Sequence, residues 1–378
     1  MPLSLPLSFR LAGFYFAFFV YAGAFVAYFP PYLAARGLGP AEIASVLALP
    51  HLARVVAPAA WGWIADRRGA HRGIVVFSCA VNAAFFAVLP HASSLAAIAA
   101  LIAGASLLSS AALPLVETVT LGALAQQPGR YGPIRLWGSI GFVGAVLGCG
   151  AWLDLRPVET LPGLLLASSL LTLVAAALLP AQRVHAAPAA GAMRLSAQAR
   201  TLLAAGFCMT VAHGALYAFL TLHLQAMGYS GTMIGLLWTL GVLAEMVVFL
   251  VLPALFRRYA LSTLLLASFA CAVLRFLVIG WGAGELWLLL AAQLLHAATF
   301  GSFHAAAVAA VHRVFPEHAQ GLGQTLFSSL AYGAGGAAGA LLAGLSWAAA
   351  GAGLAFSACA LAALAGLFLA LQLKRSGI

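Results

Sequence analysis

Apolar runs long enough to cross a lipid bilayer recur from one end of this chain to the other. A helix needs about 20 mostly apolar residues to cross the hydrocarbon core, and each crossing segment must satisfy its own backbone hydrogen bonds. Long runs rich in Ala and Leu do so as helices rather than as barrel strands. With 64% hydrophobic and 7% charged residues among 378, the sequence excludes a soluble domain and predicts an all-α polytopic membrane protein.

The apolar runs predict twelve transmembrane helices in two pseudo-symmetric six-helix bundles. The first run is too long for the hydrophobic region of a cleavable signal peptide, so we interpret it as the first span. Residues 182–199 contain no apolar run and predict a cytoplasmic linker between an N-terminal bundle, residues 1–181, and a C-terminal bundle, residues 200–378. The predicted spans are 9–33, 40–64, 72–90, 94–122, 132–153, 161–181, 200–226, 231–254, 261–281, 286–311, 319–346 and 350–373.

The basic charge of the chain indicates its membrane topology rather than a nucleic-acid ligand. The formal net charge is +10, but nearly all Lys and Arg residues outside the spans fall on one side of the predicted membrane. Only Arg36 and Arg156 fall on the other side. By the positive-inside rule, both termini are expected in the cytoplasm, which makes the chain a multi-pass protein of the cytoplasmic (inner) membrane. We expect the lipid bilayer as its surroundings and no nucleic acid as a partner.

The two halves of the sequence repeat each other. Gly37 and Gly228 lie 191 positions apart, and the same offset relates Arg54 in the second span to Glu245 in the eighth. A parallel repeat of this size implies a pseudo-two-fold axis along the membrane normal and a solute site at the midplane between the halves. We therefore expect Arg54 and Glu245, opposite in charge, to face one central cavity.

Charged side chains inside the spans are few, and each is a candidate for solute binding or proton coupling because charge is costly in a bilayer. Glu117 in the fourth span is a carboxylate of the kind that a proton-coupled carrier requires. The alternative for these residues is an ion pair that serves helix packing alone, or, for Arg135, a side chain that reaches the membrane surface. The candidates are Arg54, Glu117, Arg135, Glu245 and Arg275.

Two histidines share one face of the tenth predicted span. Spacings of three, four and four residues align four side chains on this helix: Gln293, His296, Phe300 and His304. Histidine titrates near physiological pH, so His296 and His304 can relay protons or donate hydrogen bonds to a solute. Buried structural histidines are the alternative. No third metal ligand accompanies them, and we expect no metal site.

Aromatic residues form a stripe along the first predicted span. Such stripes usually serve helix packing or lipid contact, but the repeat puts the first and seventh spans in equivalent places, where both can line a cavity. The stripe of the first span consists of Phe14, Phe18, Tyr21, Phe25, Tyr28 and Tyr32. The polar and aromatic face of the seventh span consists of Thr210, His213, Tyr217 and Thr221.

A short basic segment, residues 62–72, connects the second and third spans. It resembles the signature loop of the major facilitator superfamily at five positions: Gly62, Asp66, Arg67, Gly69 and Arg72. The resemblance implies that Asp66 and Arg67 latch helices at the cytoplasmic side and change partners during transport. The alternative is that the segment only fixes the membrane topology by its positive charge. The Arg residues alone would suffice for that role, without the Asp and the glycines.

Four further segments resemble the phenylpropionate-permease branch of the same superfamily: residues 29–33, 135–142, 296–304 and 320–324. This branch is similar to the lactose and nucleoside proton symporters. In those proteins acidic residues on spans four, eight and ten and arginines on spans five and nine handle solute and proton. Here Glu117, Arg135, Glu245 and Arg275 occupy four of those spans, whereas the tenth has His304 and no carboxylate.

These features predict a secondary active transporter that imports a small organic solute, such as an aromatic monocarboxylate, with protons by alternating access. The residues expected to bind the solute are Arg54, Arg275, Tyr21, Phe25, Tyr28, Tyr217, Phe300 and His304. The residues expected to carry protons are Glu117, Glu245, His296 and His304. The residues expected to form the cytoplasmic gate are Gly62, Asp66, Arg67, Gly69, Arg72 and Arg135.

Other functions stay open on the sequence alone. A sugar or nucleoside proton symporter uses the same spans, and a drug or metabolite efflux pump differs in the direction of proton-linked flux. An enzyme requires a convergent nucleophile or metal cluster, which the sequence lacks, and the five scattered cysteines predict no disulfide. We expect a non-enzymatic transporter without a cofactor, driven by the proton gradient and working as a monomer.

Overall fold

The structure, a computed structural model, describes residues 6–180 and 194–378, apart from the side chain of Pro128. The described residues form helices and no strands, as the composition predicts. The first half contains α1 (Leu7–Ala35), α2 (Pro40–Arg68), α3 (His71–Val88), η1 (Leu89–His91), α4 (Leu95–Ser109), α5 (Ala112–Ala123), η2 (Pro128–Arg130), α6 (Tyr131–Leu155), η3 (Val158–Thr160) and α7 (Leu161–Ala177). The second half contains α8 (Ala197–Ala212), α9 (Gly214–Ala226), α10 (Gly231–Arg258), α11 (Leu261–Gly282), α12 (Leu286–Leu294), η4 (Ala297–Ser302), α13 (Phe303–Val314), η5 (Glu317–Ala319), α14 (Gln320–Phe327), η6 (Ser328–Gly335) and α15 (Gly336–Arg375).

Eleven helical runs in the described part of the chain are long and apolar enough to cross a membrane. The last of them, Glu317–Arg375, has 59 residues. At 1.5 Å per residue it would measure about 90 Å, roughly three times the hydrocarbon thickness, if it were straight. Its backbone leaves the helical conformation at Ala350 and Gly351, where φ of Gly351 is +76°. This run therefore crosses twice, which brings the total to the predicted twelve, with boundaries within about one helical turn of those expected.

The backbone repeats between the halves as the sequence indicates. Gly37 ends the turn after α1, and Gly228 ends the turn after α9, both with φ of +84°. In each turn, the residue after the glycine donates its amide to the carbonyl five residues earlier, at 3.2 Å and 3.1 Å. Glycine adopts this left-handed conformation without a Cβ clash. The same helix-ending turn is thus built twice at equivalent places.

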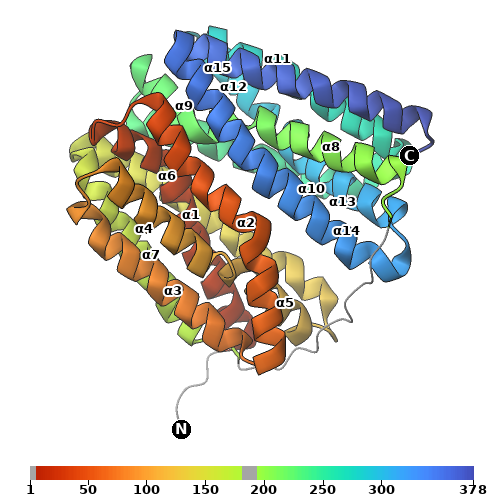
Figure 1. The fold of residues 1–378 in the computed structure, drawn as a ribbon, viewed down its shortest axis with the longest axis horizontal. Helices are drawn as coiled ribbons and strands as arrows, with labels where there is room; N and C mark the ends of the chain where they lie inside the picture. The colour runs from red at the N-terminus through yellow and green to blue at the C-terminus, as the bar shows by residue number, and fades with distance from the viewer. Residues whose placement is uncertain (1–5, 181–193) are drawn as a thin grey trace.

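The helices of the first half gather on one side of the molecule and those of the second half on the other (Figure 1). An even number of crossings puts both chain ends at one end of the bundle, which we call the terminal end; the opposite end, with the turns at Gly37 and Gly228, is the far end. Most of the predicted linker, residues 182–193, lies outside the described residues. Helix α8 begins inside that linker, at Ala197, because Ser196 Oγ caps it by accepting the Ala199 amide at 3.1 Å.

Hydrogen bonds between the halves lie at the far end and near the middle of the bundle. At the far end, Asp154 on α6 accepts hydrogens from the first turn of α10. Glycines let the backbones approach there: a Cβ on Gly150 would overlap the carbonyl of Gly231. Near the middle, α2 contacts η6 through His51 and Ser329. Among the described residues no hydrogen bond or ion pair joins the halves at the terminal end, so the structure is closed at the far end.

Candidate functional site

Arg54 is the charged residue that the structure exposes between the halves. His51, three residues before it, bonds the carbonyl of Tyr332 across the interface at 3.1 Å, and Val55, directly after it, accepts a hydrogen bond from Ser329 Oγ at 3.1 Å. Arg54 itself is exposed to solvent although both neighbours contact η6. Its guanidinium thus remains available to a ligand at the place where the halves meet.

Three tyrosines lie close enough to the Arg54 guanidinium to interact with it electrostatically: Tyr21, Tyr217 and Tyr332. They come from α1, α9 and η6, and all three are partly exposed. Tyr217 is stacked on Trp238 of α10, with ring centroids 6.3 Å apart and an interplanar angle of 19°. A cation that interacts electrostatically with tyrosines from three helical segments suits an anionic solute with an apolar body.

The predicted face of the tenth span exists as a column of stacked rings. The rings of His296 and Phe300 are 5.3 Å apart at 10°, and those of Phe300 and His304 are 6.3 Å apart at 11°. Between them the chain forms a π-helix, η4, whose wider turn keeps residues four apart nearly in line. Such π-bulges occur frequently at functional sites. Phe300 and His304 are partly exposed, whereas His296 is buried.

Glu245 faces this column rather than Arg54. Its Oε2 lies 3.7 Å from His296 Nε2, and its charge also acts on His304. The Glu245 side chain keeps 20% exposure, against 10% for His296. The repeat does place Arg54 and Glu245 at equivalent positions, but no ion pair joins them. Glu245 therefore belongs to a cluster with the histidines, and the Arg54 guanidinium is not neutralised by it.

Arg275 is buried, with 1% exposure. Its guanidinium donates to three neutral acceptors: Ala292 O at 2.9 Å, Thr299 Oγ1 at 3.0 Å and Gln293 Oε1 at 3.0 Å. These bonds fasten α11 to the junction of α12 and η4. In this conformation Arg275 supports the column of rings and has no free face for a solute.

The aromatic stripe of α1 divides into lining and packing residues. Tyr21 and Phe25 are partly exposed and contact Phe86 of α3, at 5.5 Å and 6.2 Å between ring centroids. Tyr28 is fully buried, and its hydroxyl donates to Val146 O at 2.7 Å, with Gly231 O at 3.3 Å. Tyr28 thus ties α1 to α6 and α10 instead of facing the site.

Glu117 forms a separate cluster in the first half. Tyr131 donates its hydroxyl to Glu117 Oε2 at 2.6 Å, and Arg135 Nε lies 3.5 Å from Glu117 Oε1. The Arg135 guanidinium also stacks over Phe19, 4.3 Å from the ring centroid. The sequence interpretation missed Tyr131, although its position four residues before Arg135 indicates a shared helical face.

The predicted basic loop is shorter than expected, because α2 continues through Arg68 and only Gly69 and Ala70 separate it from α3. Gly69 ends the helix with φ of +60°. Asp66 pairs with His71 at 3.1 Å, and Arg67 stacks over Trp63 at 4.2 Å. Arg72 donates to the carbonyl of Ala177, and Gly62 has open space around it. All described polar partners of this segment are in the first half.

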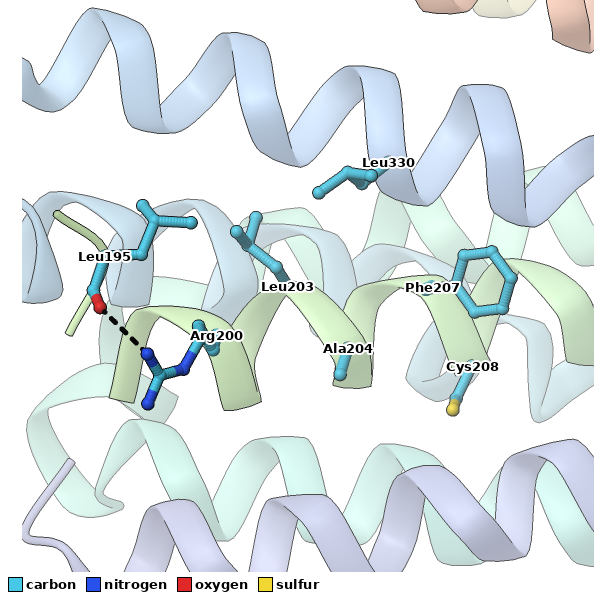
Figure 2. A pocket seen from close by; sticks show the side chains of 7 residues that line it. All are labelled: Leu195, Arg200, Leu203, Ala204, Phe207, Cys208 and Leu330. Carbon is cyan, nitrogen blue, oxygen red and sulfur yellow. Dashed lines mark hydrogen bonds between the residues drawn. The ribbon is translucent and has the colours of Figure 1, made fainter. Parts of the chain in front are cut away.

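An apolar hollow on the surface of α8 lies apart from these groups. Figure 2 shows Arg200 at one end of it, bonded to the carbonyl of Leu195 at 3.5 Å, and Phe207 and Cys208 at the other. Its lining residues are Leu195, Arg200, Leu203, Ala204, Phe207, Cys208 and Leu330. None of the solute or proton candidates borders it, so we place the candidate site between the halves.

A twelve-span helical bundle with a cation, aromatic rings and a titratable cluster at the interface of its halves defines a membrane transporter. Among residues 6–180 and 194–378, no group of three or more His, Cys, Asp or Glu side chains is placed to hold a metal ion.

Comparison with known proteins gives the family. The model of the MFS_1 like family matches residues 8–358. A probable 3-phenylpropionic acid transporter of Escherichia coli (strain K12) is 31% identical over 309 residues, which cover 78% of this chain and 79% of that protein. The maltose permease of Geobacillus stearothermophilus is 28% identical over 331 residues, covering 85% and 83%. The chain therefore belongs to the MFS_1 like family of the major facilitator superfamily, and it is a transporter rather than an enzyme.

Solved structures agree on the fold. The nucleoside transporter NupG, in a crystal structure of a point mutant, superimposes with a TM-score of 0.82 at 17% identity, covering 99% of this chain and 100% of that one. A bacterial homologue of the iron transporter ferroportin in an inward-facing state superimposes with a TM-score of 0.73 at 16% identity, covering 99% and 100%. The major facilitator architecture expected from the sequence is thus confirmed.

Proposed function

We propose that this transporter imports a small aromatic monocarboxylate together with protons, by alternating access. The single observation behind the solute class is Arg54, an exposed cation whose neighbours His51 and Val55 contact the other half and whose guanidinium interacts electrostatically with three tyrosines. A guanidinium binds a carboxylate through two parallel hydrogen bonds, and the neighbouring rings suit an aromatic body. The 3-phenylpropionic acid named for the Escherichia coli relative has this chemistry.

Each group has a distinct role in this proposal. Arg54 holds the carboxylate, while Tyr21, Phe25, Tyr217 and Phe300 contact the ring. The proton belongs to the cluster of His304, His296 and Glu245: Glu245 pairs with His296 at 3.7 Å, and its charge also acts on His304. Arg275 positions this cluster from behind, and Glu117 with Arg135 braces α5 against α6.

Because the far end is closed, the site can open only toward the terminal end. If the basic terminal end faces the cytoplasm, as the positive-inside rule predicts, this structure is the state in which the site opens inward. In that state Asp66 and Arg67 make no contact across the halves. This agrees with their observed partners, His71 and Trp63, which both belong to the first half. We place the protein in the inner membrane with both termini in the cytoplasm, and we expect a monomer to transport.

A sugar or nucleoside symporter is the second candidate, because the Glu117, Arg135 and Tyr131 cluster offers several hydrogen-bonding atoms and keeps partial exposure. The maltose permease relative supports this alternative. An efflux pump would use the same site with the opposite proton-linked flux.

Binding distinguishes the solute classes. The purified full chain in detergent is heated with 3-phenylpropionate, maltose, a nucleoside or a cationic drug, since a ligand of the native state raises the melting temperature. We expect 3-phenylpropionate to stabilise the wild type and the Arg257→Gln control, which alters an exposed arginine at the end of α10, but not Arg54→Gln. Stabilisation by maltose or nucleoside alone would replace the proposed solute class.

Transport distinguishes the directions. In proteoliposomes with an imposed pH gradient, 3-phenylpropionate should accumulate on the side that protons enter. Accumulation against the incoming protons would instead identify an efflux pump.

A further inference from the structure

Tyr332 connects groups that belong to three different helical segments. It lies in the π-helix η6, and its backbone carbonyl accepts a hydrogen from His51 Nδ1 of α2 at 3.1 Å. Its hydroxyl lies 2.6 Å from His304 Nδ1 of α13. Its ring therefore stands between the half that carries Arg54 and the half that carries the proton cluster.

Glycine packing fixes this position. A Cβ on Gly336 would overlap the His51 ring, and one on Gly333 would lie 2.8 Å from a methyl carbon of Val55. Ser329 Oγ donates to Val55 O in the same contact. The π-helix is thus held against α2 on both sides of Tyr332.

A tyrosine hydroxyl has one hydrogen to donate. When His304 Nδ1 carries a lone pair, the hydroxyl donates to it and has no hydrogen left for another partner. When His304 is doubly protonated, Nδ1–H must be the donor, and the tyrosine hydrogen turns to a different acceptor. A carboxylate is such an acceptor, and Arg54 lies on α2 between His51, which bonds the Tyr332 carbonyl, and Val55, which bonds Ser329 of the same π-helix. Its charge also acts on Tyr332.

We propose that the Tyr332 hydroxyl is the switch that links a proton on His304 to carboxylate binding at Arg54. The inference rests on the function proposed above and names the residue that couples its two ligands. A bound carboxylate takes the hydroxyl hydrogen, and the lone pair of His304 Nδ1 then binds a proton from solution and donates it to the tyrosine oxygen. In this switch Nε2 keeps its hydrogen throughout, so the hydrogen on Nδ1 does not come from a change of tautomer. No covalent bond of the solute changes. By linkage, the proton on His304 strengthens carboxylate binding by the same factor.

The charges around the switch agree in sign with this coupling. Glu245 on α10, which pairs with His296 at 3.7 Å, acts electrostatically on both His304 and Tyr332, and its negative charge favours a protonated imidazole. Arg54 on α2 opposes it until the carboxylate neutralises the guanidinium. Tyr217 of α9 is the other ionisable group acting on Tyr332, and His51 offers its Nδ1 hydrogen to the backbone only.

Calorimetric titration of the purified full chain with 3-phenylpropionate tests the switch. Repeating the titration in buffers of different ionisation enthalpy counts the protons taken up with the ligand. For the wild type we expect proton uptake and an affinity that rises about tenfold from about pH 8 to about pH 6. Tyr332→Phe, which keeps the ring and the backbone bond, should bind without proton uptake and with an affinity that changes less than about twofold.

Tyr259→Phe is the matched control, because Tyr259 ends α10 at an exposed position; it should behave as the wild type. Proton uptake by Tyr332→Phe equal to that of the wild type would overturn the switch and leave the proposed function standing. A wild type that binds the carboxylate without proton uptake would instead overturn proton coupling itself.

A second variant covers the case in which Tyr332→Phe does not fold. His304→Gln keeps a hydrogen-bonding side chain but cannot take the proton. It should bind the carboxylate with no pH dependence. Full pH dependence in His304→Gln would place the proton elsewhere and reject the switch.

Discussion

Asp154 on α6 accepts the backbone amide of Thr232 on α10 at 2.9 Å, so a side chain of the first half caps a helix of the second. The same carboxylate accepts the Thr232 hydroxyl at 2.6 Å and the Gly231 amide at 2.5 Å. A carboxylate at a helix N-terminus satisfies free amides and complements the helix dipole. This cap lies at the far end and holds the halves together there.

Asp154→Ala should loosen the far end. Loss of a capping side chain costs about 1 kcal/mol, so the amides at the start of α10 should exchange hydrogen about fivefold faster. Hydrogen–deuterium exchange of the peptide around Thr232 measures this directly. Asp154→Asn, which keeps one acceptor oxygen, should give an intermediate rate. Unchanged exchange in Asp154→Ala would show that the cap does not hold the closed end.

Gly150→Ala should open the same end by a steric route. The added Cβ would overlap the carbonyl of Gly231 and lie 2.6 Å from the Tyr28 hydroxyl. Gly148→Ala on the same helix is the control, because nothing lies within 4 Å of its Cβ. We expect faster exchange at the start of α10 for Gly150→Ala alone. Equal behaviour of the two variants would contradict the close contact.

Arg275→Lys should destabilise the protein. Lysine has no planar fork and cannot reach Ala292 O, Thr299 Oγ1 and Gln293 Oε1 together, so buried acceptors lose partners. We expect a loss of about 2 kcal/mol, seen as a lower melting temperature of the purified protein. Arg257→Lys, at an exposed position, is the control. A melting temperature equal to that of the wild type would mean that Arg275 does not brace η4.

Glu117→Gln should keep proton-driven accumulation. Glu117 is engaged by Tyr131 and Arg135, and both ion-pair partners keep partial exposure, so the change removes a modest interaction. Accumulation of 3-phenylpropionate in proteoliposomes should stay within about twofold of the wild type. Exchange without accumulation would transfer the proton role from His304 to Glu117.

The sequence predicts the scaffold well because bilayer thickness and backbone hydrogen bonding leave few choices. Twelve spans follow from apolar run length, and the turns at Gly37 and Gly228 follow from the repeat. The twelve-span count required the break at Ala350 and Gly351, which falls on the first two residues of the predicted twelfth span, directly after the predicted gap at 347–349.

The site is less predictable, because it depends on which face of each helix is covered. Arg54 and Arg275 look alike in the sequence, yet one is exposed between the halves and the other is buried. The sequence did not predict Tyr332 as a site residue, because a π-helix changes the register of side chains without changing the apolar pattern. Asp154 bonds Thr232 across the two halves, a pairing that no local spacing indicates.

The equivalent turns at Gly37 and Gly228 show that the two halves share a backbone geometry but differ in side chains. The backbone geometry stayed the same in both copies, while the residue at the equivalent position inside the next helix became Arg54 in one and Glu245 in the other. Under the proposed function, Arg54 holds the anion and Glu245 belongs to the cluster that takes the proton. The two halves therefore share a backbone frame but carry opposite charges on the two sides of the pseudo-two-fold axis. Hybrids that join halves of different relatives should fold, and each should change the specificity for only one of the two ligands.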